Sequence, residues 1–206
     1  MTADPNVLVL VLRGAGDRAF CGGFDLDHVE PTVDDGPLRR LMGSVRQAPV
    51  PVVAVLHGAA VGAGFELASS CDLRVGVRGA KVGVPAVQLG VPYALEGIAQ
   101  MIRSHSGAMR LLLTGQLLTL EDLPGFATIV AASDLNAEVT DLSRQLCEVS
   151  PAALNYTRRA IAWAMGDGSE DHTALEALRR EVQSGADLQE AAQARRAGRA
   201  PRFRRG

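Results

Sequence analysis

The pattern of apolar positions changes along the chain, from short continuous runs in the first part to helical spacing toward the end. Three runs of strand length, Val7–Leu12, Val52–Leu56 and Leu73–Val77, predict strands, and the first is typical of a strand buried on both faces. Leu38–Arg46 and Ile98–Leu113 carry apolar residues at helical spacing and predict helices. Because strands alternate with helices, this part of the chain predicts an α/β fold.

The last third of the sequence predicts helices alone. An amphipathic stripe runs over 135–149, Ser150-Pro151 offers a helix N-cap followed by a first-turn proline, and 175–182 marks a further helix. We therefore expect two regions, an α/β core over 1–133 and a helical C-terminal region over 134–206.

Charge and cysteine usage exclude several classes of function. With 23 Asp and Glu against 21 Lys and Arg, the net charge of −2 offers no general attraction to nucleic acid or to an anionic membrane. No apolar run reaches the roughly 18 residues of a membrane-spanning helix, and the N-terminus lacks the pattern of a signal peptide. The three cysteines are widely spaced without a CxxC motif, which argues against a disulfide framework or a metal site. We expect a cytoplasmic protein with reduced thiols.

One glycine-rich loop raises the alternative of a dinucleotide site. Gly14-x-Gly16-x-x-Ala19 follows the first strand, and Asp34 and Asp35 come about 20 residues later. A dinucleotide site needs a helix to begin within that loop, whereas this loop continues into Gly22-Gly23, which disfavours a helix. We therefore set the dinucleotide interpretation aside.

Two segments, Arg18–Leu26 and His57–Leu73, combine a strand with a glycine turn, and the second turn opens a helix. Glycines let the backbone approach a ligand closely, and the first N–H groups of a helix have no partner within it. Two such turns side by side would direct backbone donors at one oxygen atom.

These two segments resemble the signature segments of the crotonase family, also called the enoyl-CoA hydratase/isomerase family, which acts on acyl-CoA thioesters. The resemblance implies that the backbone amides of Phe24 and Ala63 hold the thioester oxygen and stabilise an enolate. It implies a crotonase-like spiral of ββα units, with no cofactor beyond the CoA of the substrate. It also implies substrate contacts from Gly22, Asp25, Leu26, Gly62, Pro85, Ala86 and Leu89.

Glu66 lies in the first turn of the helix after the second glycine turn, where the family places a catalytic carboxylate. The alternative is a surface glutamate that complements the helix dipole. The family's hydratases use a second glutamate in a Gly-x-Pro-Glu motif, and this sequence has Gly83-Val84-Pro85-Ala86 instead. Because alanine transfers no proton, the resemblance disfavours a two-glutamate hydratase.

The stretch Leu89-Gly90-Val91-Pro92-Tyr93, with Gly97 four residues later, is similar to the methylmalonyl-CoA decarboxylase branch of the family. Asp34–Arg39 also resembles that branch, although Phe24 stands where the branch has a histidine. The branch implies that the Tyr93 hydroxyl contacts the substrate carboxylate; the alternative is a core aromatic with a satisfied hydroxyl. His57, His28 and Cys21 are interpreted as structural.

Decarboxylation of a methylmalonyl-CoA-like thioester is therefore the first functional hypothesis, with Glu66 and Tyr93 as catalytic residues. An isomerase or atypical hydratase that uses Glu66 alone is the second, and a non-catalytic acyl-CoA-binding subunit is the third. The helical C-terminal region resembles the family's trimerisation region and implies a homotrimer or a dimer of trimers. Relative to the family, the chain is short at its N-terminus, before Val7–Leu12, where two strands and a helix are expected.

Overall fold

The computed structural model describes residues 4, 6–25, 35–168 and 170–203. Its contacts divide the chain into two compact units. The first contains the described residues of 10–48 and 52–140, and the second contains those of 4–9, 49–51 and 141–203.

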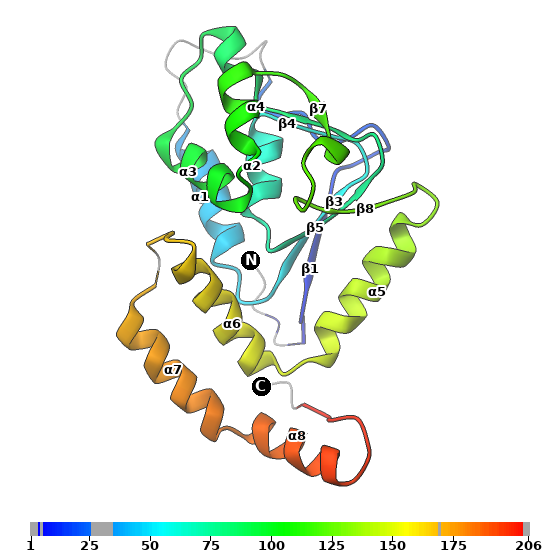
Figure 1. Cartoon of the computed structure of the whole chain (residues 1–206), viewed down its shortest axis with the longest axis vertical. Coiled ribbons are helices and arrows are strands. Elements are labelled where there is room, and N and C mark those ends of the chain that lie inside the picture. The colour runs from blue at the N-terminus through cyan, green and yellow to red at the C-terminus, as the bar shows by residue number, and fades with distance from the viewer. Residues whose placement is uncertain (1–3, 5, 26–34, 169, 204–206) are drawn as a thin grey trace. The chain divides into compact units, whose positions relative to one another are not determined.

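Two four-stranded sheets form the frame of the first unit (Figure 1). One sheet is fully parallel, in the order β1-β3-β5-β8, and the other has the order β2-β4-β6-β7, with only β7 antiparallel to its neighbour. The bounds are β1 Leu10–Arg13, β2 Ala19–Cys21, β3 Val52–Leu56, β4 Ala59–Val61, β5 Leu73–Val77, β6 Lys81–Gly83, β7 Leu118–Thr119 and β8 Thr128–Val130. Each long strand of the first sheet is followed by a short strand of the second, as in the predicted crotonase-like ββα units.

The strands β3 and β5 have the predicted bounds, and all five residues of β3 are buried. The first strand differs from its prediction, because it begins at Leu10 and pairs only with β3. Its half-buried and exposed positions alternate, and the Val11 side chain is 43% exposed. The prediction of a strand buried on both faces is therefore wrong, since β1 lies at the edge of the sheet that the structure describes.

The helices of the first unit are α1 Gly36–Arg46, α2 Ala63–Ser70, α3 Leu95–Ser104 and α4 Ala108–Thr114, with a 3₁₀ segment η2 at Pro85–Leu89. Helix α2 packs against both α1 and α3. The prediction of one continuous helix over Ile98–Leu113 is wrong, because two helices, α3 and α4, occupy this range. His105 takes an extended conformation, and its Nδ1 accepts a hydrogen bond of 3.0 Å from the N–H of Gly107, which separates α3 from α4.

The core of the first unit is built where α2 meets the parallel sheet. The rings of Phe65 and Phe126 stack with centroids 4.9 Å apart, and the Arg74 guanidinium lies 4.8 Å from the Phe126 centroid. Arg74 also donates hydrogen bonds to the carbonyl oxygens of Phe126, Ala68 and Cys71 at 2.6, 3.1 and 2.8 Å. This one side chain therefore ties the C-terminal end of α2 to the chain before β8.

Helices make up most of the second unit. Their bounds are α5 Leu135–Glu148, whose first residues belong to the first unit, α6 Pro151–Ala164, α7 His172–Ser184 and α8 Ala186–Arg196. The predicted N-cap is confirmed, because the Ser150 hydroxyl accepts a hydrogen bond of 3.1 Å from the Ala153 N–H. Sequence reasoning missed α8, which has few apolar residues to show a period.

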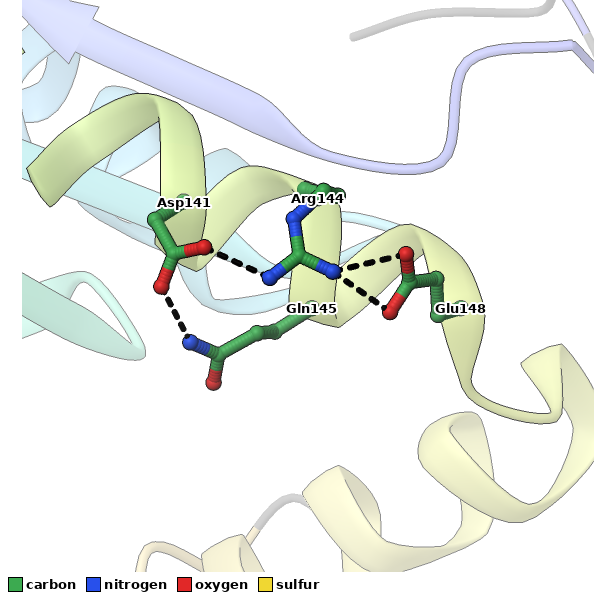
Figure 2. Close-up of polar contacts among 4 residues, drawn as sticks. All are labelled: Asp141, Arg144, Gln145 and Glu148. Atoms are coloured by element: carbon green, nitrogen blue, oxygen red, sulfur yellow. Dashed lines mark hydrogen bonds and ion pairs between the residues drawn. The ribbon is translucent and has the colours of Figure 1, made fainter. Parts of the chain in front are cut away.

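Along the exposed face of α5, side chains one turn apart form a charged network (Figure 2). Arg144 contacts Asp141 at 2.6 Å and Glu148 at 2.8 Å, and Gln145 donates to Asp141 at 2.7 Å. Exposed pairs at this spacing support a helix only weakly. Across the described ranges, no helix has the length and apolar character needed to cross a membrane.

Candidate active site

The two glycine turns singled out in the sequence lie against each other in the first unit. Gly23 has a φ of +95°, and a Cβ atom there would lie 2.9 Å from the carbonyl oxygen of Val61 and 3.5 Å from the Ala63 nitrogen. A Cβ atom on Gly64 would overlap the carbonyl oxygen of Cys21. Only glycine therefore permits this close approach, and it brings together residues some 40 positions apart in the sequence.

The backbone amides of Phe24 and Ala63 lie on these two turns. Ala63 is the first residue of α2, after Gly62, whose φ of 56° is in the left-handed region. Neither amide has a hydrogen-bond acceptor within the part of the chain that the structure describes. Both donors are therefore available to an oxygen atom of a ligand.

Glu66 lies in the first turn of α2 and is only 5% exposed. Its Oε2 accepts a hydrogen bond of 2.9 Å from the Tyr93 hydroxyl. Burial raises the pKa of the Glu66 carboxyl, and the hydrogen bond from Tyr93 and the charge of Arg46 offset part of that rise. The alternative of a surface glutamate is therefore wrong, since only 5% of Glu66 is exposed.

Tyr93 is half-buried, and its hydroxyl is satisfied by Glu66 itself. Burial and the neighbouring carboxylate both raise the pKa of the Tyr93 hydroxyl, so it remains a neutral donor. The resemblance implied a contact between Tyr93 and a substrate carboxylate, and the structure shows this hydroxyl donating to the carboxyl group of Glu66.

Gly97 lies against both Glu66 and Tyr93, and the sequence analysis did not identify it as a site residue. It lies in the first turn of α3, and a Cβ atom there would be 2.9 Å from Glu66 Oε1 and 2.9 Å from Tyr93 Cε1. The available signal was a glycine inside a helical segment, where alanine is normally better.

The other predicted contact residues lie in two groups around the glycine turns and η2. Gly22 and Asp25 are exposed beside Phe24, while Leu26 falls outside the described residues, as do His28 and Asp34. Pro85 and Ala86 are half-buried in η2, and Leu89 is 53% exposed at its end. At the position of the family's second glutamate, η2 presents the methyl group of Ala86.

Two residues interpreted as structural are also placed. Cys21 is half-buried in β2, with its carbonyl against Gly64. The His57 ring lies 3.3 Å from the Val55 carbonyl oxygen through Nδ1, and its buried Nε2 has no partner in the structure. Among the described residues no group of three His, Cys, Asp or Glu side chains has the arrangement of a metal site.

Comparisons with known proteins find a family model, relatives and solved structures that are similar to this chain. The family model described as enoyl-CoA hydratase/isomerase matches residues 1–204. A Thermus thermophilus protein named as an enoyl-CoA hydratase is 32% identical, over 98% of this chain and 85% of its own length. The (E)-benzylidenesuccinyl-CoA hydratase of Thauera aromatica is 29% identical over 76% of this chain, and the match spans only 65% of that relative.

The human methylglutaconyl-CoA hydratase is 26% identical over 80% of this chain and 53% of its own length. Among solved structures, the enoyl-CoA hydratase/carnithine racemase of Magnetospirillum magneticum superposes with a TM-score of 0.88. That match has 28% identity and covers 99% of this chain and 81% of the other.

Proposed function

Because the chain belongs to the enoyl-CoA hydratase/isomerase family, we propose that this site binds an acyl-CoA thioester and stabilises its enolate. The amides of Phe24 and Ala63 would donate to the thioester oxygen as negative charge develops on it. Among the described residues neither amide has an acceptor, which supports this role. Backbone donors of this kind are worth about 3 kcal/mol each to a transition state.

The proposal assigns proton transfer at carbon to Glu66. The observation that carries it is the 2.9 Å hydrogen bond from Tyr93 to a glutamate that is only 5% exposed and follows the paired glycine turns. Tyr93 holds one carboxyl oxygen, Oε2, and Oε1 accepts no hydrogen bond from the described residues. Oε1 is therefore the oxygen left to exchange a proton with substrate.

We propose decarboxylation of a malonyl-type thioester as the first candidate reaction. The C–C bond to the carboxylate breaks, CO₂ leaves, and the electron pair of that bond forms the enolate held by the two amides. The protonated form of Glu66, which burial favours by raising the pKa of its carboxyl, then gives its proton to the α-carbon and is reprotonated from water. This sequence needs no second carboxyl group, which agrees with Ala86 in η2.

The names of two relatives bear on the acyl group. Benzylidenesuccinyl-CoA and methylglutaconyl-CoA are both thioesters that keep a free carboxylate. A similar substrate here would offer its carboxylate to Tyr93, which would exchange its bond to Glu66 for one to the ligand. The free carboxylate is thus the feature that we propose for the substrate class.

Double-bond isomerisation is the second candidate, and the same hydrogen bond favours it. A donor on Oε2 stabilises the anionic form of Glu66, which could then remove the α-proton of a 3-enoyl thioester and return it to the γ-carbon. Both candidate reactions pass through an enolate and use one carboxyl group. The electron pair of the enolate comes from the C–C bond to the carboxylate in decarboxylation and from the α C–H bond in isomerisation.

A homotrimer or a dimer of trimers is the proposed assembly, as in the family that the sequence resembles. Helices of the second unit leave large apolar side chains exposed, including Ile161 at 53%, Trp163 at 46% and Leu188 at 55%. Burying such side chains between subunits would remove apolar surface from water. Light scattering coupled to size-exclusion chromatography would report the subunit number directly.

Mass spectrometry of thioester turnover tests the proposed reaction. Purified protein is incubated separately with methylmalonyl-CoA, a 3-enoyl-CoA and a 2-enoyl-CoA. Loss of CO₂ from the first supports decarboxylation. Conversion of the second into the third, which has the same mass and is separated from it by liquid chromatography, supports isomerisation. Binding of all three without turnover would instead support a non-catalytic acyl-CoA-binding subunit and overturn the proposal.

A further inference from the structure

The first turn of α3 lies directly on the carboxyl group of Glu66. A Cβ atom on Gly97 would be 2.9 Å from Glu66 Oε1, 3.0 Å from its Cδ and 2.9 Å from Tyr93 Cε1. Separations under about 3 Å are shorter than side chains tolerate, so even a methyl group would displace one of these partners. Gly97 is itself buried, so the added methyl group would point at these partners and not at solvent.

Local conformation does not explain this glycine. Gly97 lies inside α3 and is absent from the residues with positive φ, so its backbone suits any amino acid. Glycine is the poorer helix former, so alanine would strengthen the helix if space allowed. The requirement for glycine therefore comes from the close contact with Glu66 and Tyr93.

We propose that Gly97 is a positioning residue, which holds Glu66 Oε1 in its reactive place by leaving the space beside it free of side-chain atoms. This inference rests on the proposed function of Glu66. With a thioester that has no free carboxylate, two constraints then fix the carboxyl group: the Tyr93 hydroxyl holds Oε2, and the bare surface of α3 sets the position of Oε1. A displacement of about 1 Å at such a group can cost about a hundredfold in rate.

The test compares two glycine-to-alanine variants in helices. Gly97→Ala adds a methyl group against Glu66, whereas Gly43→Ala adds one in α1 where nothing lies within 4 Å of the new Cβ. The readout is exchange of the α-protons of a saturated acyl-CoA with D₂O, followed by mass spectrometry. Gly97→Ala should lose about tenfold or more in exchange rate with acyl-CoA affinity within about threefold of wild type, and Gly43→Ala should match wild type. An exchange rate for Gly97→Ala within about twofold of wild type would overturn the proposal.

Repeating Gly97→Ala in a Glu66→Asp background distinguishes positioning of the carboxyl group from a general role of Gly97 in packing α3. Glu66→Asp shortens the side chain by one methylene and withdraws the carboxyl group from the new methyl. Adding Gly97→Ala to Glu66→Asp should therefore cost much less exchange than adding it to wild type. An equal cost in both backgrounds would show that Gly97 serves only the packing of α3, and would contradict the proposal even if both variants lose stability.

A titration keeps this inference independent of turnover. The charged groups around Glu66 are Arg46 at the end of α1, Asp35 before α1 and Glu96 next to Gly97. The Tyr93→Phe substitution leaves all of these charged groups unchanged. In the wild-type background it should raise the pKa of Glu66, which carbon NMR measures. The same change should have little effect beside Gly97→Ala, where the contact is already displaced. An equal shift in both backgrounds overturns the role of Gly97, whereas absence of exchange in the wild type overturns the proposed function instead.

Discussion

Glu66 is a buried side chain that is also the proposed acid or base of the site. It is one of few polar side chains in the described core, and its only hydrogen-bond donor there is Tyr93. Burying an ionised carboxylate is costly, so the folded protein favours the protonated form more strongly than the unfolded chain does. The same burial that makes the ionised form of Glu66 costly to the fold would favour the acid form that the proposed decarboxylation uses.

Glu66→Gln should make this cost visible as a pH-dependent difference in stability. Because the folded-state pKa of Glu66 is raised, its stabilising contribution is complete below the unfolded-state value and is lost as the pH rises through the folded-state value. Glutamine keeps an acceptor for Tyr93 and has no charge to bury. Melting temperatures measured from about pH 4 to about pH 8 should show the variant gaining on wild type as the pH rises. A constant gap would contradict a raised pKa.

Tyr93→Phe removes the donor that stabilises the Glu66 anion. The Glu66 pKa should rise further, so any activity that needs Glu66 as a base should move to higher pH. An activity that needs Glu66 as an acid should persist to higher pH instead. The pH profile of kcat/KM thus reports which form of Glu66 acts, and an unchanged profile would show that Tyr93 does not tune it.

Element boundaries followed from the sequence where an apolar run was long enough to be unambiguous. Val52–Leu56 and Leu73–Val77 are such runs, and both strands have the predicted bounds. The second sheet was missed because β2, β4 and β6 have three residues each, too few to show a period. The break between α3 and α4 was missed because it depends on the hydrogen bond between His105 and Gly107, which apolar spacing does not record.

Arg74 is the side chain on which the junction of α2 and the β5–β8 edge most depends. Its guanidinium donates to three carbonyl oxygens and lies over Phe126, a geometry that lysine does not reproduce. Arg74→Lys should therefore destabilise the fold by about 2 kcal/mol, measured by urea unfolding. Arg144→Lys on exposed α5 is the matched control and should leave the unfolding midpoint nearly unchanged. Equal effects of the two changes would refute the role given to Arg74.

On the scale of the whole molecule, the candidate site draws on segments that lie far apart in the chain. The sequence predicted the glycine turns, Glu66 and Tyr93 through resemblance to a family. It did not predict the Tyr93–Glu66 hydrogen bond or the contact of Gly97, because these depend on how α3 packs against α2. Single-residue patterns report burial and local conformation, while contacts between elements require the fold.

Binding of CoA thioesters should stabilise the whole chain. A ligand that binds only the folded state raises the melting temperature in proportion to the logarithm of its concentration over Kd. Saturated acyl-CoA should therefore raise the melting temperature of wild type and of Glu66→Gln alike, since the amides of Phe24 and Ala63 are present in both. A shift confined to wild type would show that Glu66, rather than the two amides, carries the binding.

Deuterium incorporation at the α-carbon or the γ-carbon of the product reports whether Glu66 transfers a proton to an acyl-CoA enolate. Wild type and Glu66→Gln are incubated in D₂O with methylmalonyl-CoA and with a 3-enoyl-CoA, and the thioesters are analysed by mass spectrometry. With wild type we predict deuterium at the α-carbon of the decarboxylated thioester or at the γ-carbon of the isomerised thioester, and a loss of about a hundredfold or more in that rate with Glu66→Gln. Equal incorporation by the two proteins, or none by wild type from any thioester that it binds, would contradict the account.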